Sequence, residues 1–514
     1  MSTSVYADAD AALIAELRKK TDERIRQIRE TRDEEITGIP VYYVSNAGND
    51  ENDGLSPDTA WETPAKASTV TGPAAVRFAR GGIYRGQIKA QPGVTYAAYG
   101  EGPKPMIYGS PENGADASKW TQTADDPTVW IYETVFSEDV GLLVFDEGAM
   151  HATKTVLKAG APDGVVTTEG HFGTCINMTW GNVFRDYHDL QYDLDFWHDD
   201  IDRRVYLKSK ENPGKRFSSI EFNVRHNVIA VGGSNDVTVD NLCVKYGGCH
   251  GVGAGTVKNL TVKNCEFGWI GGAIQYIRDN RTVRFGNAVE IYGGCDNYSV
   301  TDCYVWQVYD AGITQQVGLG TDPANRDVLR HQKNMTYARN VIEYCNYSIE
   351  YFLGVPDGNP SRMEHFLIED NYMWYAGTGV CEQRPDLTQG SHIKSWNSSN
   401  RATDYVIRNN VFVDSKDLML HISSKLRNPD GSDSMPVLSG NLFLGREGGK
   451  LGSCAMDSTT WMPYDREILT YLGDRTHGDT FCFLAPDTVT QIGGAPASKA
   501  SSARPRDFGP WTLR

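Results

Sequence analysis

The chain has 514 residues and a formal net charge of −16, with 40% hydrophobic and 23% charged residues, which is ordinary for a soluble globular protein. The acidic balance argues against nucleic acid as the main partner, because phosphate binding needs a basic surface. No run of about 18 apolar residues is present, which argues against a membrane-spanning helix.

The start of the chain and its cysteines bear on the compartment. The stretch MSTSVYADADAALIAELRKK lacks the basic start and long apolar segment of a signal peptide. Ten cysteines occur without a CxxC pair or a Cys/His cluster, so we expect reduced thiols and no bound metal. These features predict a cytoplasmic protein, and an extracellular one is the alternative if a signal has been trimmed from the sequence.

Residues 7–36 are predicted to form one helix. The segment is rich in good helix formers and in oppositely charged pairs at helical spacing. We expect the helix to dock on the body of the protein, and a homo-oligomer held through this helix is the alternative. Its apolar residues form only a thin stripe, made by Leu13, Ile14, Leu17, Ile25 and Ile28.

Short strands separated by turns follow the predicted helix. The strand-like VYYV leads into a polar loop rich in Asn, Asp and Gly, and the segment 76–110 is cut by glycine at short intervals. Residues 111–225 are less regular, with strand-like pieces such as VWIYETVF and RRVYLKS. We interpret them as a β-rich insertion or accessory layer.

From residue 226 to about 450 the sequence repeats itself. Strand-like segments can be superposed so that one position recurs about once per coil of a solenoid, with apolar residues alternating around it. We predict that the coils stack and that the recurring side chains form a hydrogen-bonded ladder at a tight turn. An antiparallel β-sandwich with Asn-rich turns is the alternative. The recurring positions are Leu242, Cys265, Cys303, Asn340, Asn371, Asn410 and Asn441.

The segments VSNAGNDENDGLSPDTAWETP and FARGGIYRG, followed by this ladder, resemble the right-handed parallel β-helix proteins of the pectate-lyase-like superfamily. The resemblance covers roughly residues 41–450 and matches no single family's full catalytic signature. It implies a carbohydrate-active enzyme, most like the β-helix glycoside hydrolases. The superfamily also includes polysaccharide lyases and alginate epimerases, so the fold alone does not fix the reaction.

We therefore predict an all-β fold, a right-handed parallel β-helix with an N-terminal α-helix and a β-rich insertion. The expected divisions are a helical extension (1–40), the start of the β-helix (41–110), the insertion (111–225), the β-helix core with the catalytic face (226–450), and a C-terminal cap and tail (451–514).

Acidic residues recur at one place on the predicted coils. In AVEIY, GITQQ, SIEYF, VCEQR and MLHIS the apolar residue points inward, so the next residue points outward on a shared face. The outward residues are then Glu290, Thr314, Glu350, Glu382 and His421, although the alignment can slip by one residue near Cys381. Loops at about 274–286, 317–334, 353–364, 384–403 and 424–436 are expected to wall a cleft around them.

Several carboxylates on one wall suit glycoside hydrolysis, in which one acid protonates the leaving oxygen and another attacks or activates water. We predict Glu290, Asp310 and Glu350 as the catalytic residues. The predicted substrate-binding residues are charged, polar or aromatic side chains suited to a sugar: Glu382, Arg384, His392, Lys394, Trp396, Trp306, Tyr309, Tyr351, His421 and Gln315.

A metal site is not predicted. His188, His198 and the adjoining acids lie in a polar, strand-like stretch rather than in a ligand frame, and NDENDG lacks the pattern of a calcium loop. His250 and His392 are each more readily explained as structural than as catalytic.

We predict a glycoside hydrolase acting on oligosaccharides or glycosides, with no cofactor and with neither nucleic acid nor membrane as a partner. One alternative is a lyase or epimerase on uronic-acid-containing glycans, in which Lys394, Arg384 and His392 would serve. Another is a non-enzymatic carbohydrate-binding β-helix. The sugar, the anomer, the linkage and the stereochemical outcome stay open.

Overall fold

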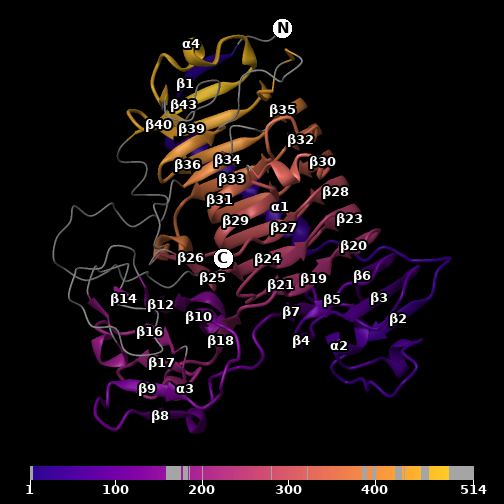
Figure 1. The fold of residues 1–514 in the computed structure, drawn as a ribbon, viewed down its shortest axis with the longest axis vertical. Helices are drawn as coiled ribbons and strands as arrows, with labels where there is room; N and C mark the ends of the chain where they lie inside the picture. The colour runs from indigo at the N-terminus through magenta and orange to yellow at the C-terminus, as the bar shows by residue number, and fades with distance from the viewer. Residues whose placement is uncertain are drawn as a thin grey trace.

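The structure is a computed structural model. It describes residues 4–157, 175–176, 183–184, 186–199, 201–278, 281–320, 322–384, 390–395, 401–422, 431–432, 434–452 and 462–485. Parallel strands are stacked along the long axis of the molecule (Figure 1). The predicted all-β, parallel β-helix fold is confirmed.

One side of the solenoid is an eleven-stranded sheet, which we call the flat sheet. All of the strand pairs in it are parallel. Its strands, in order, are β2 (Val41–Val44), β3 (Ala74–Ala79), β6 (Val94–Tyr99), β20 (Val237–Asp240), β23 (Val257–Lys263), β28 (Cys295–Thr301), β30 (Gln332–Ala338), β32 (Met363–Glu369), β35 (Ala402–Arg408), β38 (Val437–Ser439) and β42 (Thr476–His477).

A nineteen-stranded sheet forms the other two sides, as two strips that merge in the long strands β29 (Tyr304–Gly318) and β31 (Val341–Gly354). The helix-covered strip also contains β4 (Ile83–Arg85), β7 (Met106–Tyr108), β21 (Cys243–Lys245), β24 (Glu266–Ile270), β33 (Tyr372–Ala376), β36 (Val411–Ser415), β39 (Leu442–Arg446), β43 (Thr480–Leu484) and β1 (Val5–Ala9). The acid strip also contains β5 (Ile88–Lys89), β19 (Ile229–Gly232), β22 (Val252–Ala254), β27 (Val289–Tyr292), β34 (Ser391–Ser395), β37 (Leu418–His421) and β40 (Lys450–Gly452), and the antiparallel β41 (Met462–Pro463) pairs with β40.

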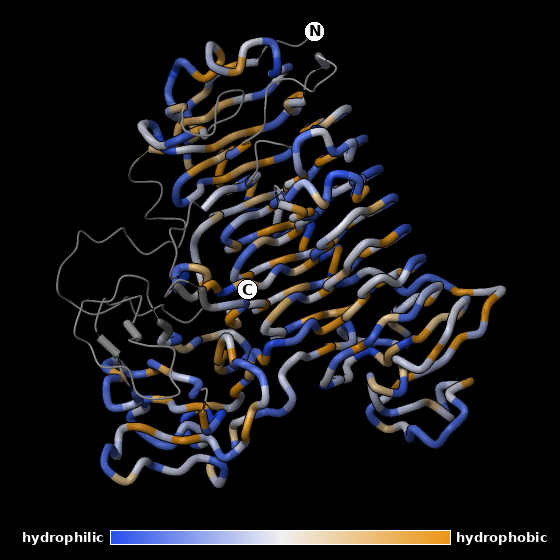
Figure 2. Tube along the Cα trace, in the orientation of Figure 1, coloured by the Kyte–Doolittle hydropathy of each residue, from blue (hydrophilic) through white to orange (hydrophobic). Residues whose placement is uncertain are grey.

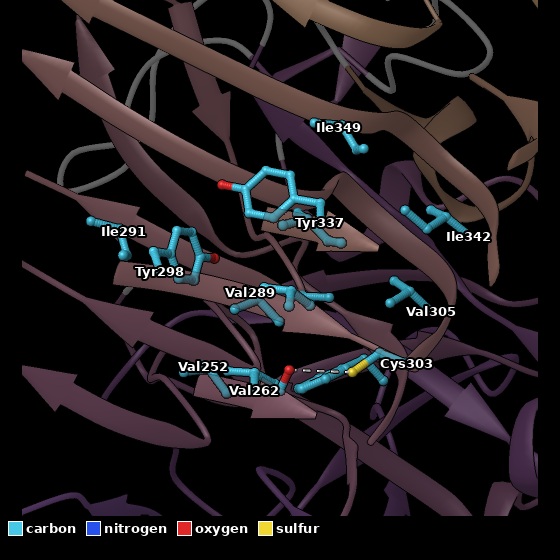
Figure 3. Close-up of a cluster of buried hydrophobic side chains, with 14 of the residues drawn as sticks. Val252, Val262, Val289, Ile291, Tyr298, Cys303, Val305, Tyr337, Ile342 and Ile349 are labelled. Atoms are coloured by element: carbon cyan, nitrogen blue, oxygen red, sulfur yellow. Dashed lines mark hydrogen bonds between the residues drawn. The ribbon is translucent and has the colours of Figure 1, made fainter. Parts of the chain in front are cut away.

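The three sides enclose one apolar core. Each coil contributes inward-facing side chains, and Figure 3 shows a cluster in which Val289 and Ile349 of the acid strip lie near Val305 and Tyr337. Hydrophobic residues recur along successive strands (Figure 2). Because no single coil can bury its apolar side chains alone, the stacking of coils is what stabilises the fold.

The predicted ladder is present at the turn between the flat sheet and the helix-covered strip. The Asn371 side-chain oxygen accepts from the backbone N–H of Asn340 (2.9 Å) and from its side-chain amide (3.0 Å). Asn410 and Asn441 repeat the pattern, and the Asp479 carboxylate ends it one coil later. Buried side-chain amides therefore satisfy the backbone groups of the turn.

The N-terminal helix α1 spans Ala11–Arg29, shorter than the predicted 7–36, and the short strand β1 precedes it. Its buried residues face the outer side of the helix-covered strip, where Ile25 and Ile28 pack with Tyr304 and Trp306. The apolar stripe is thus covered by the chain's own sheet, as expected for a docked helix. The oligomer that was predicted as an alternative stays a prediction.

Between β7 and β19 the chain leaves the solenoid. It forms small sheets from β8 (Trp120–Gln122), β9 (Val129–Tyr132), β10 (Val140–Phe145), β11 (Met150–His151), β12 (Thr153–Lys154), β16 (Asp195–His198), β17 (Val205–Lys208) and β18 (Ile220–Val224), and β13 (Val156–Leu157), β14 (Cys175–Ile176) and β15 (Val183–Phe184) make a further one. We call residues 109–228 the insertion. It has its own apolar cluster and lies beside the lower coils (Figure 1).

Short helices complete the described residues: α2 (Pro64–Ala67), α3 (Pro213–Arg216) and α4 (Ile468–Leu472). No helix within these described ranges is long and apolar enough to cross a membrane.

Candidate active site

Charged side chains are stacked in register on the outer face of the acid strip. Glu290 of β27 is the strand partner of Thr314, which is the partner of Glu350 on β31. The stack continues to Lys394 of β34 and His421 of β37. The preceding residue on each strand points into the core, and each of these is fully buried: Val289, Ile313, Ile349, Ile393 and Leu420.

This register confirms the predicted alignment of Glu290, Thr314, Glu350 and His421. The predicted fourth member is wrong, because Lys394 and not Glu382 is the strand partner of Glu350. Glu382 lies in a short 3₁₀-helix, Val380–Gln383, outside the strand, and its carboxylate lies 3.4 Å from Lys416. The segment VCEQR therefore does not form the predicted strand. The strand at this place in the coil is β34, which the segment SHIKS forms.

Glu290 is 7% exposed and is held by two neighbours. Its Oε2 atom lies 2.9 Å from Nδ1 of His250 and accepts a hydrogen bond of 2.5 Å from the Asn287 amide. Burial by itself would raise the pKa of Glu290, but the charge of His250 and the two hydrogen bonds outweigh burial and lower that pKa. The Glu290 carboxylate is thus kept ionised in a nearly dry place.

Glu350 is 4% exposed and lies between an amide and an ammonium group. Gln316 donates to its Oε2 atom at 2.6 Å, and Lys394 is the next residue in the stack. Burial lowers the pKa of Lys394 to about 7, despite the opposing charge of Glu350. Nζ of Lys394 contacts Nδ1 of His421, and burial together with that lysine lowers the pKa of His421 to about 3.

Asp310 lies on β29 where the two strips meet. Its Oδ1 atom accepts a hydrogen bond of 2.5 Å from Arg384, which forms an ion pair with it. The guanidinium of Arg384 lies 5.6 Å from the ring centre of Tyr309 and 5.9 Å from that of Tyr347. Gly312, two residues after Asp310, packs closely against the backbone of the next coil, since a Cβ atom added there would lie 2.7 Å from the Ser348 carbonyl oxygen. A ligand therefore has no room at this position.

The insertion reaches the loop that carries Arg384. The side chain of Gln383 accepts from the backbone N–H of Lys154 (3.1 Å) and donates to the Ala152 carbonyl (2.9 Å). Arg284, which is fully buried, donates to the Gln383 carbonyl (3.3 Å) and lies over Tyr309. Arg384 is therefore anchored from both the insertion and the hairpin β25 (Ile274–Arg278) and β26 (Arg281–Arg284).

Four predicted binding residues do not lie on this face. Gln315 and Tyr351 alternate with the stack and point into the core, where the Tyr337 hydroxyl donates to the Gln315 amide oxygen. Trp306 stacks on Tyr304 beneath helix α1. His392 is fully buried, with Nδ1 3.0 Å from the Ser348 hydroxyl and Nε2 3.0 Å from the Asp414 carbonyl. Trp396 lies outside the described residues.

Sequence reasoning missed several side chains beside the acids. Tyr292, Gln316 and Phe352 form a second outward row, two residues beyond Glu290, Thr314 and Glu350. The same period-two alternation that selected the acids selects this row as well. Asn287, which binds Glu290 and accepts from the Ala311 N–H (2.7 Å), had no pattern that could have identified it.

Other parts of the surface offer less chemistry. A groove of about 620 Å³ on the outer face of the flat sheet is lined mainly by amide and hydroxyl side chains such as Asn259, Asn297 and Thr336. Two of the residues that line it, His365 and Asp404, lie 2.7 Å apart and are exposed. Within the part of the chain that the structure describes, no group of three or more His, Cys, Asp or Glu side chains could hold a metal ion.

No protein-family model matches the sequence, and no curated protein matches it. Solved structures with a similar fold include one described as a glycoside hydrolase, with a TM-score of 0.49 and 9% identity, covering 87% of this chain and 99% of that one. The XylC complex with xylose has a TM-score of 0.43 and 12% identity, covering 80% and 76% of the two chains.

A GH136 lacto-N-biosidase from Eubacterium ramulus has a TM-score of 0.37 and 14% identity, covering 92% of this chain and 71% of its own. These solved structures are described as a glycoside hydrolase, a complex with xylose and a lacto-N-biosidase. The parallel β-helix fold that the sequence predicted is confirmed by the strand pairing of this chain itself. With identities this low, the residues of the site must support any statement about activity.

Proposed function

We propose that this protein is a glycoside hydrolase acting on oligosaccharides or glycosides, with Glu290, Glu350 and Asp310 as its catalytic residues. One observation carries the proposal: Glu290 and Glu350 point outward from the same strip, in register, with only Thr314 between them. Two strand spacings separate them, roughly 9.6 Å.

Strands this far apart leave room for a water molecule between the two carboxyl groups, as an inverting reaction requires. Glu290, with its lowered pKa, takes a proton from the water. The water oxygen bonds to the anomeric carbon as the glycosidic bond breaks, and an acid group gives its proton to the leaving oxygen. Glu350 is the second carboxyl group of the pair and would serve as this acid in its protonated form, and Asp310 with Arg384 borders the same face.

The proposal is tested by assaying chromogenic glycosides with the purified protein and with Glu290→Gln, Asp310→Asn and Glu350→Gln. Glu364→Gln is a matched control, because Glu364 is an outward carboxylate on the flat sheet, 3.0 Å from Lys333. Loss of turnover in Glu290→Gln and Glu350→Gln, with full activity in the control, supports the proposal. Full activity in all three acid variants contradicts it.

A lyase or epimerase on uronic-acid glycans is the second candidate, and the environment of Lys394 favours it. An amine whose pKa is about 7 can accept a proton near neutral pH, and Arg384 could neutralise a substrate carboxylate. A lyase releases an unsaturated product that absorbs ultraviolet light, whereas a hydrolase does not. Turnover of a uronic-acid polymer that is lost in Lys394→Met but kept in Glu290→Gln would replace the first proposal with this one.

A further inference from the structure

A row that contains two aromatic side chains lies beside the proposed catalytic residues. Tyr292 is 53% exposed, the side chain two residues beyond Glu290 on the same face of β27. Its strand partners are Gln316 and then Phe352. An open aromatic ring beside carboxylates is suited to a ligand that presents both an apolar face and polar groups.

The Tyr292 ring lies along the surface, and Gly318 makes this position available. A Cβ atom added at Gly318 would come within 2.4 Å of the Tyr292 hydroxyl and 3.7 Å of the Phe352 ring. The two rings therefore border the same glycine, which is exposed. A third tyrosine, Tyr276 of β25, is 42% exposed. Burial is the main cause that raises the pKa of Tyr292, and the charges of Glu290 and Tyr276 add to it.

We infer that Tyr292 and Phe352, with Gly318 between them, form a stacking platform for the sugar unit next to the one that is cleaved. This inference rests on the proposed function. It restricts the substrate to glycans of at least two sugar units. A residue rise of about 3.3 Å puts the platform roughly 6.6 Å along the strands from the acids. The glycan then runs parallel to the strands of the acid strip.

The chemistry of the row fits a carbohydrate. An aromatic face binds the apolar C–H face of a sugar, and the polar groups beside it bind hydroxyls. Gln316 supplies such a group between the two rings, and it also donates to Glu350 (2.6 Å). Sugar binding at the platform is thereby connected to one of the two acids.

The test compares 4-nitrophenyl glycosides of one sugar with those of the corresponding disaccharide. We expect Tyr292→Ala to lower the ratio of kcat/KM for disaccharide over monosaccharide substrates by about tenfold, whereas Tyr292→Phe, which keeps the ring, retains the ratio. Gly318→Ala should lower the ratio as well, since its Cβ displaces the Tyr292 ring. Leu55→Ala is the control, because Leu55 is equally exposed (58%) but lies in the polar loop after β2.

Failure of the platform can be told apart from failure of the proposed function. If Glu290→Gln abolishes hydrolysis but the ratio in Tyr292→Ala equals that of the wild type, the platform alone is wrong. If no glycoside is cleaved, calorimetric titration with xylo-, cello- and galacto-oligosaccharides decides: binding that is weaker in Tyr292→Ala supports the platform. Absence of binding to all of these oligosaccharides overturns it.

Discussion

Oε2 of Glu290 lies 2.9 Å from Nδ1 of His250, on neighbouring coils of the solenoid. The histidine opposes the effect of burial and keeps the pKa of Glu290 low. We predict that His250→Leu raises this pKa, because only the hydrogen bond from Asn287 then opposes the effect of burial. If Glu290 must be ionised to act as a base, the acidic limb of the pH profile of kcat/KM moves to higher pH.

The matched control for that experiment is His365→Leu. His365 is exposed on the flat sheet, where it pairs with Asp404 at 2.7 Å. Its removal should leave the acidic limb in place. An unchanged limb in His250→Leu, with Glu290 still required for turnover, would show that the histidine does not set the ionisation of Glu290.

Lys394 gives the protein a pH dependence of stability. Its pKa in the folded state is about 7, whereas an unfolded lysine titrates near its ordinary value, about 10.4. Between these two values the unfolded chain binds more protons, so stability rises with pH in that window. We predict that wild type gains stability relative to Lys394→Met from pH 7 to pH 9, measured by urea unfolding.

Lys333→Met serves as the comparison for Lys394, because Lys333 is a partly exposed lysine paired with Glu364 at 3.0 Å. Its free energy of unfolding relative to wild type should stay constant across the same pH range. A constant difference for Lys394→Met would mean that Lys394 keeps its proton in the folded state.

The ladder at the turn predicts a large stability effect at a distance from the acids. The Asn371 side chain accepts from the backbone and amide of Asn340 and donates to the Tyr337 carbonyl (3.0 Å) and to Asn410 (2.8 Å). Asn371→Ala removes these four hydrogen bonds and takes away the side-chain partner of the buried Asn340 N–H, and a buried polar group left without its partner costs about 1–3 kcal/mol. We expect a total loss of about 3 kcal/mol or more in the free energy of unfolding.

Cys303→Ala at an equivalent ladder position is the natural comparison for Asn371→Ala. The Cys303 thiol makes only weak contacts to carbonyls, 3.2 Å from Thr301 and 3.9 Å from Val262. Its loss should cost about 1 kcal/mol. Equal losses for the two variants would show that the amide ladder contributes no more than packing.

The coil register was predictable because two independent patterns agree on it. Alternation of apolar residues fixes which side chains face the core, and the recurring Asn fixes the turn, so Glu290 and Glu350 fall on one face. The same patterns fail at Glu382, where Gly377 and Gly379, both with positive φ, lead into a 3₁₀-helix instead of a strand. The segments VCEQR and SHIKS could each have supplied the strand at this place in the coil, and only the packing of the whole coil decides which of them does.

Side-chain partners across the coils were beyond reach of the sequence. The contacts of Glu290 with His250 and of Asp310 with Arg384 join residues from different loops, and no local pattern encodes their approach. Trp306 and Tyr351 show the reverse error, since an aromatic residue near the acids in sequence can lie beneath a helix or in the core. Conversely, the exposed Tyr292 lies two residues from Glu290 and was not among the predicted substrate-binding residues.

The contact between the insertion and Gln383 predicts that a segment far away in the sequence supports the site. Gln383 is bound to Lys154 and Ala152 of the insertion, and the next residue is Arg384, the partner of Asp310. We predict that Gln383→Leu lowers kcat/KM by about tenfold through misplacement of Arg384. The double variant with Arg384→Leu should then be no worse than Arg384→Leu alone, because both changes remove the same interaction.

Arg216→Leu, which breaks the ion pair with Asp193 (2.7 Å) inside the insertion, is the control and should act additively with Arg384→Leu. Additive losses for Gln383→Leu as well would mean that the insertion contact stabilises the fold without positioning Arg384.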